Sequence, residues 1–175
     1  DLTFLGVLES MGLRVEPASG QIRVSAASNP HSPDVDFNAF SDTFLTLAAL
    51  APLLPGTTRI RGIAHTRHQE TDRIRAMANE LRKLGQGIEE TEGSLTIHPD
   101  REKMIALTRS EPLSVKTYDD HRVAMSFGIL GCHDLHGDGR PWLRILDPDC
   151  CAKTFPDFFE ELARMRSVAK AHHES

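Results

Sequence analysis

The chain contains an internal repeat, and this feature limits the folds that it can adopt. Residues 5–16 (LGVLESMGLRVE) align without gaps with residues 78–89 (ANELRKLGQGIE), 73 positions later. The match continues through Gly20 with Gly93, Ile22 with Leu95, and Val24 with Ile97. Each copy has the pattern of an amphipathic helix, a helix-ending glycine, and two short strands around a glycine turn. The chain is therefore expected to fold as a series of related units.

Looser matches extend the repeat to a unit of strand, helix, strand, helix, strand, strand. Residues 42–45 match residues 120–123, and residues 80–84 match residues 160–165. In the middle copy the six elements are expected at residues 35–37, 42–54, 58–63, 70–84, 88–90 and 94–97. In the last copy four elements are expected at 115–117, 120–130, 142–146 and 155–165, while the first copy has only a helix and a hairpin. The units span about 1–27, 34–98 and 112–166, with linkers at 28–34 and 99–111.

Strands that alternate with helices predict an α/β architecture of repeated βαβαββ units. The segments 42–54 and 123–130 are apolar and almost uncharged, so we expect two buried helices. The first unit lacks its opening elements and the last lacks its closing hairpin, and the chain starts at Asp1 without a methionine. These observations predict a fragment of a longer protein.

Composition excludes several classes of function. A chain of 175 residues with 39% hydrophobic and 26% charged residues is typical of one soluble globular domain. Its net charge of -5 argues against a general nucleic-acid-binding protein. No apolar run approaches the roughly 20 residues that span a bilayer, so no membrane partner is expected. Three cysteines do not form a disulfide framework, which favours a reducing, cytoplasmic location.

Basic residues occupy unusual positions in the sequence. Arg73, Arg122 and Lys153 lie in or just before the first turn of three expected helices. A helix N-terminus is already partly positive, so a cation there costs up to about 1 kcal/mol at an exposed site. Helix N-termini and guanidinium groups both bind phosphate and carboxylate. With Asp42 at a fourth helix start, this pattern predicts an active-site rim for a multiply charged acid.

Structural roles are also open for these residues. Glu70 and Arg73 share the apolar face of one helix and either point into a cleft or form an ion pair at i,i+3. Asp42 either favours its own helix dipole or acts as a general base. Residues 154–157 have the pattern of a capping box, which leaves the neighbouring Lys153 without a structural role.

The second motif, residues 119–122, has equally plain alternatives. Asp119 or Asp120 can cap the helix that follows, and His121 can be a hydrogen-bonded core histidine. Metal binding is not predicted, because residues 65–68 and 132–136 lack a partner pair at zinc-finger spacing. No phosphate-binding glycine loop is present either, so no nucleotide is expected.

Four motifs together resemble the 5-enolpyruvylshikimate-3-phosphate (EPSP) synthase family. They are residues 36–42 (DFNAFSD), 70–73 (ETDR), 118–125 (YDDHRVAM) and 152–159 (AKTFPDFF), in the order and with the separations of that family. The resemblance covers residues 1–166 and corresponds to the C-terminal portion, rather less than half, of that enzyme; residues 167–175 are expected to be a tail. It implies one globe, incomplete here, of the family's two inside-out α/β globes.

The resemblance also implies a reaction and residue roles. The family transfers the enolpyruvyl group of phosphoenolpyruvate to the 5-hydroxyl of shikimate-3-phosphate, releases phosphate, and uses no cofactor. By this resemblance, Asp42 would be the base for the hydroxyl, and Glu70 would transfer the proton at C3. Arg73 and Arg122 would hold the phosphoenolpyruvate carboxylate, and Lys153 would hold its phosphate. His121 would line the same pocket.

Two positions depart from the family pattern. Gln69 stands where the family commonly has a lysine, and His65 where it has an asparagine; both positions contact shikimate-3-phosphate in the family. The family's N-terminal domain, which supplies further phosphate-binding residues, is not in this chain, so we expect the chain alone to be inactive. The alternatives are a UDP-N-acetylglucosamine enolpyruvyl transferase, which lacks the ETDR and KTFPD patterns, and a non-catalytic folding or binding fragment.

Overall fold

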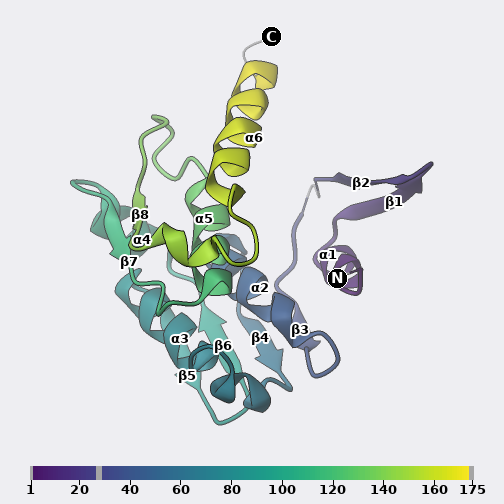
Figure 1. Cartoon of the computed structure of the whole chain (residues 1–175), viewed down its shortest axis with the longest axis vertical. Helices are drawn as coiled ribbons and strands as arrows, with labels where there is room; N and C mark the ends of the chain where they lie inside the picture. The colour runs from purple at the N-terminus through teal and green to yellow at the C-terminus, as the bar shows by residue number, and fades with distance from the viewer. Residues whose placement is uncertain (1, 27–28, 174–175) are drawn as a thin grey trace.

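A computed structural model describes residues 2–26 and 29–173, and its N-terminal unit contains a helix and a hairpin (Figure 1). The elements are α1 (Phe4–Ser10), β1 (Arg14–Ala18) and β2 (Gln21–Ser25). Gly12 follows the helix at φ +90°, a conformation that favours glycine. The two strands pair in antiparallel register, with Val15 opposite Val24. The predicted order of helix, glycine and hairpin is confirmed.

The middle unit contains all six predicted elements in the predicted order. They are β3 (Asp34–Asp36), α2 (Phe44–Leu50), β4 (Thr58–Arg61), α3 (Arg73–Lys83), β5 (Gly87–Glu90) and β6 (Leu95–His98), with short 3-10 helices η1 (Ser41–Thr43), η2 (Ala51–Leu53) and η3 (Ala64–His68). The strands form one sheet in the order β3-β4-β6-β5. β3 runs parallel to β4, and β6 is antiparallel to both of its neighbours.

Two helix boundaries in this unit differ from the prediction. The helix expected at 42–54 is a 3-10 turn, an α-helix and a second 3-10 turn, which contains Pro52. Proline lacks the amide hydrogen that an α-helix interior needs. The helix expected from Glu70 begins at Arg73, because the Asp72 side chain accepts a hydrogen bond from the Arg75 amide and caps the helix there.

The polar segment 99–111 is not a plain linker, because it contains helix α4 (Arg101–Thr108). Asp100 caps this helix by accepting from the Lys103 amide at 2.9 Å, and Met104 is buried. Gly85, at φ +82°, lies beneath it, and a Cβ there would come within 2.8 Å of Lys103 Cγ. The helix was missed because it is short and mostly exposed, so its sequence lacks a clear apolar stripe.

The last unit contains β7 (Leu113–Val115), α5 (His121–Gly131), β8 (Leu143–Ile145), a 3-10 turn η4 (Pro148–Cys151) and α6 (Phe158–His173). β7 and β8 pair in parallel, as β3 and β4 do. The capping box predicted at 154–157 is wrong, because the chain forms turns there and α6 begins at Phe158. Helix α6 also continues to His173, through most of the segment expected to be a tail.

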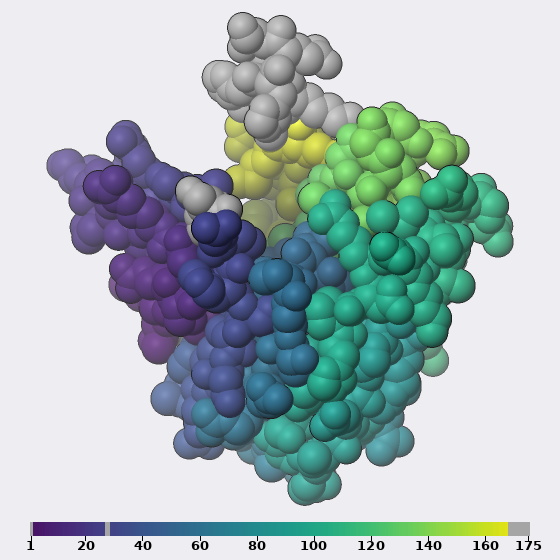
Figure 2. All heavy atoms as spheres, turned by 180° about the vertical axis from the view of Figure 1, so that it is seen from behind, coloured from purple at the N-terminus to yellow at the C-terminus, as the bar shows by residue number. Residues whose placement is uncertain are grey.

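The two apolar helices pack against each other at the centre of the molecule. α2 and α5 lie side by side, and Phe44, Leu47 and Phe127 on them are fully buried (Figure 1). The N-terminal unit forms one side of the molecule in the space-filling view (Figure 2). Among the described residues, no helix is long and apolar enough to cross a membrane. The packing brings the N-terminal ends of α3 and α5 together, close to η1.

Candidate active site

A buried ion pair joins the starts of helices α3 and α5. Arg73, the first residue of α3, has a side chain that is only 4% exposed. Its Nε donates to Asp120 Oδ2 at 2.7 Å, and Asp120 is fully buried. Asp120 Oδ1 also accepts from the Arg122 amide at 2.8 Å, which caps α5. Asp120, rather than Asp119, is therefore the cap, and it also neutralises a buried cation.

Asp42 links this pair to the second arginine. Its Oδ1 accepts from Arg73 Nη1 at 3.1 Å, and its Oδ2 accepts from Arg122 Nη2 at 2.7 Å. Gln69 Oε1 accepts from the same Arg73 Nη1 at 2.6 Å. The Asp42 and Arg122 side chains are 46% and 34% exposed, so solvent reaches this side of the cluster. Asp42 lies in the first turn of η1 but makes no capping hydrogen bond there.

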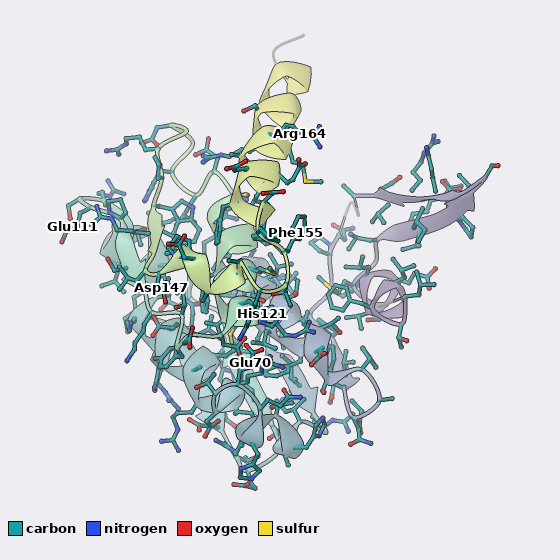
Figure 3. The ribbon with its side chains drawn as sticks, in the orientation of Figure 1. Glu70, Glu111, His121, Asp147, Phe155 and Arg164 are labelled. Carbon is teal, nitrogen blue, oxygen red and sulfur yellow. The ribbon has the colours of Figure 1, made fainter. Side chains whose placement is uncertain are left out.

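Glu70 pairs with a different set of residues. Its Oε2 lies 3.0 Å from His121 Nδ1, and its Oε1 lies 3.2 Å from Lys153 Nζ. Figure 3 shows Glu70 and His121 close together below the start of α6. The alternative of an ion pair between Glu70 and Arg73 is not what the structure shows. Instead Glu70 joins the start of α5 to the η4–α6 turn that carries Lys153.

Seven of the eight residues singled out in the sequence form two adjoining groups. One group contains Asp42, Gln69, Arg73 and Arg122, and the other contains Glu70, His121 and Lys153. They meet at the start of α5, where Asp120 and His121 are neighbours in the chain. His65 lies at the outer edge, with Nε2 2.8 Å from Ser41 Oγ. The sequence suggested that Asp120 caps α5, but it did not predict the ion pair between Asp120 and Arg73. The one hint of a second role was that this acid stands two residues before Arg122.

A metal ion is one possible ligand for part of this cluster. One donor atom each of Glu70, Asp120 and His121 lies within 4.8 Å of the others. However, Asp120 is already bound to the Arg73 guanidinium, and Glu70 faces the Lys153 ammonium. A divalent cation would lie next to these two positive groups, which is electrostatically unfavourable. The cluster is therefore better suited to an anion that replaces a carboxylate beside Arg122 or Lys153.

A nucleophilic cysteine does not fit this site. Cys151 lies beneath the start of α5, with its Sγ 3.8 Å from the backbone oxygen of His121. Burial is the main cause that raises the pKa of its thiol to about 12. The reactive form of cysteine is the thiolate, which is scarce at neutral pH for such a group. Cys151 therefore has a packing role.

The comparisons with known proteins agree with the motifs. A sequence model of the family EPSP synthase (3-phosphoshikimate 1-carboxyvinyltransferase) matches residues 1–162. The chain is 57% identical over 149 residues to the 3-phosphoshikimate 1-carboxyvinyltransferase of Opitutus terrae, which covers 85% of this chain and 33% of the relative. It is 38% identical over 165 residues to that of Nostoc punctiforme, covering 94% of this chain and 35% of the relative.

A solved structure shows the same fold. The chain superimposes on an EPSP synthase from Acinetobacter baumannii with a TM-score of 0.69 and 23% sequence identity, over 93% of this chain and 38% of that one. The chain thus spans about a third of the length of the relatives that it matches. These named relatives favour EPSP synthase over the UDP-N-acetylglucosamine enolpyruvyl transferase. The α/β architecture of repeated βαβαββ units is confirmed, and the chain belongs to the EPSP synthase family.

Proposed function

We propose that this chain carries the C-terminal part of the active site of a 3-phosphoshikimate 1-carboxyvinyltransferase. The observation that carries the proposal is the Asp42 carboxylate, which lies between Arg73 and Arg122 at the starts of two helices. A substrate carboxylate can take the same position, because a guanidinium fork matches any carboxylate in geometry and charge. The family's two substrates together bring two phosphates and two carboxylates. A cytoplasmic location is part of the proposal and agrees with three free thiols.

The exposed faces of the cations suggest how phosphoenolpyruvate binds. Its carboxylate would bind the partly exposed Arg122 together with Nη1 of the more buried Arg73. Its phosphate would bind Lys153, whose side chain is 52% exposed. Both cations would then exchange a protein carboxylate for a substrate group. This exchange would release Asp42 and Glu70 for proton transfer.

The proposed steps balance in atoms and charge. The 5-hydroxyl oxygen of shikimate-3-phosphate attacks C2 of phosphoenolpyruvate, and Asp42 takes the hydroxyl proton. Glu70 delivers a proton to C3, which gives a tetrahedral intermediate. The C2–O bond to phosphate then breaks while C3 returns a proton to Glu70, which restores the enol ether, and the departing phosphate oxygen takes the hydroxyl proton from Asp42. His121, beside Glu70, holds that carboxylate in place, and His65 and Gln69 would face the shikimate hydroxyls.

Shikimate-3-phosphate, the other substrate, would also need binding groups from outside these 175 residues. By resemblance, the phosphate of shikimate-3-phosphate binds residues of the N-terminal domain of the enzyme. We therefore expect the isolated chain to bind phosphoenolpyruvate but not to turn it over. Release of phosphate on mixing the chain with both substrates would contradict this part of the proposal.

A titration with phosphoenolpyruvate tests the binding. In the ¹⁵N-labelled chain, the Nε–Hε signals of Arg73 and Arg122 should move at millimolar ligand. The Arg122→Gln variant should raise the Kd at least about tenfold, because it removes a charged hydrogen-bonding partner. Arg164→Gln is the matched control: Arg164 lies farther along α6, paired with Glu161, away from Glu70 and His121 (Figure 3). No movement of either signal, or an equal loss of affinity in both variants, would overturn the proposal.

A further inference from the structure

A buried acid in the middle of α3 has no role in the proposed chemistry. Glu80 is fully buried, and its carboxylate accepts three hydrogen bonds. The donors are Tyr118 Oη at 2.7 Å, the Lys116 amide at 3.1 Å and Lys83 Nζ at 2.5 Å. A buried carboxylate is unfavourable unless it is paired. Two of its three partners belong to the segment between β7 and α5, so Glu80 fixes that segment.

Helix α3 therefore holds the segment at two points. Glu80 lies seven residues, about two turns, after Arg73, so both side chains project from the same side of the helix. Arg73 binds Asp120 at the start of α5, while Glu80 binds Lys116 and Tyr118 a few residues earlier. The residues between these two anchors form the corner that leads into α5.

The backbone of this corner is strained. Tyr118 and Asp119 have φ values of 58° and 56°, in the left-handed region that favours glycine. The Asp120 amide donates to the Thr117 carbonyl at 3.1 Å and closes the turn. Such a conformation persists only where surrounding contacts enforce it. Without the anchor at Glu80, the corner is free to relax, and Asp120 would move relative to Arg73.

The Tyr118 hydroxyl is suited to this task because it remains a donor. Burial, followed by the hydrogen bond to Glu80, raises its pKa to about 12. The Lys116 Nζ lies 5.1 Å from the centre of the Tyr118 ring, which adds a cation–π contact within the segment. The Tyr118 hydroxyl thus keeps the proton that it donates to Glu80 throughout the physiological pH range.

We propose that Glu80 and Tyr118 are positioning residues for the anion site. They hold the corner at residues 118–119 so that Asp120 engages Arg73 and the first turn of α5 presents Arg122. Neither side chain contacts the proposed substrate. The part of this inference that concerns ligand affinity rests on the proposed function, whereas the part that concerns Arg73 does not.

The test is the Tyr118→Phe variant of the 175-residue chain. Without any ligand, the Arg73 Nε–Hε signal should move, because its hydrogen bond to Asp120 changes. The Kd for phosphoenolpyruvate should rise at least about fivefold. Glu80→Gln, which loses the acceptor for the Lys116 amide, should change both readouts in the same direction and serves if Tyr118→Phe does not fold. The double variant should lose less affinity than the product of the two single losses, because both act through one corner.

Thr108→Val is the matched control, since it also removes a buried hydroxyl that donates a hydrogen bond, here to the Met104 carbonyl in α4 at 2.8 Å. It should lower stability but leave the Arg73 signal and the Kd unchanged. Lower stability in Tyr118→Phe with an unchanged Arg73 signal and Kd would overturn the inference. If the wild-type chain does not respond to phosphoenolpyruvate, the proposed function fails, and the ligand-free Arg73 signal still decides whether Glu80 and Tyr118 position this site.

Discussion

At the scale of single residues, Asp120 belongs to both the fold and the candidate site. Its carboxylate binds the Arg73 guanidinium and caps α5, and its amide closes the turn after β7. Burying an aspartate and an arginine removes both from water, and their attraction offsets this only while both are present. Arg73 is therefore pre-oriented on the buried side of the cluster, and Arg122 is the more accessible of the two arginines.

Removing the Asp120 charge should destabilise the chain strongly. Asp120→Asn keeps a capping side chain but leaves the buried Arg73 cation without its closest carboxylate, a change that costs about 3–5 kcal/mol in buried pairs. Urea unfolding at neutral pH measures the loss. Asp34→Asn breaks the Arg61–Asp34 pair, whose side chains are about half exposed, and should have a much smaller effect. Equal losses in the two variants would contradict the buried pair.

At the scale of secondary-structure elements, a second ion-pair network fastens α3 to the sheet. Glu90 of β5 binds Arg75 and Arg82 of α3 and Arg67 of η3. Burial raises the pKa of Glu90, but the three guanidinium groups outweigh that effect and lower it below its usual value of 4.5. This network lies on the outer side of α3, whereas Arg73 and Glu80 face α5 and the segment before it. The helix is thus fixed on two sides, which holds its N-terminus at the site.

This network should make stability depend on acid pH. A carboxylate with a lowered pKa contributes stability above its unfolded-state pKa, near 4.5, and loses that contribution as the pH falls through the lower folded-state value. Glu90→Gln should therefore be less stable than the wild type at neutral pH, and the difference should shrink toward about pH 3. Urea unfolding across this pH range measures it. Glu89→Gln, on the exposed side of the same strand, is the control; a Glu90→Gln difference that does not change with pH would contradict the assignment.

Helix α4 is an element that the sequence pattern does not predict. The repeat and the glycines after each amphipathic helix predicted the six elements of the middle unit in order, because its two helices and the strands β4 and β6 carry buried residues at helical or alternating spacing. α4 has only Met104 and Thr108 buried, so its sequence resembles a loop. The start of α6 was misplaced for a related reason: the pattern at residues 154–157 fits a cap, but the turns that follow η4 continue to Phe158.

At the scale of the whole molecule, the first and the middle repeat units differ in burial. Residues 34–146 surround the packed helices α2 and α5, and the strands β4 and β6 each bury two side chains fully. The hairpin β1–β2 contributes no fully buried side chain, and Ile22 and Val24 are 47% and 43% exposed. Their counterparts in the middle repeat, Leu95 and Ile97, are fully buried. The same sequence pattern is thus buried to a different extent in the two units.

Hydrogen exchange should reveal this difference. Amides of β1 and β2 should exchange by local opening, because few buried contacts hold the hairpin, whereas those of β6 and α2 should exchange only with global unfolding. Exchange followed by mass spectrometry on peptides around Gly20 and around Leu95 compares the two. Mild urea should accelerate exchange in β6 and hardly affect the hairpin. Equal protection of both hairpins would contradict this prediction.

The sequence by itself determined the order of the elements within each repeat unit, the unit that repeats, the family, and which cations and acids to consider for the candidate site. These properties are readable because periodicity, capping residues and motifs act over short stretches of chain. Only the tertiary structure decided which acid faces which cation. Asp42 lies 80 residues before Arg122, and Arg73 lies 47 residues before Asp120. Such pairs form because the packing of α2, α3 and α5 brings the helix starts together, and electrostatic attraction depends on distance in space rather than along the chain.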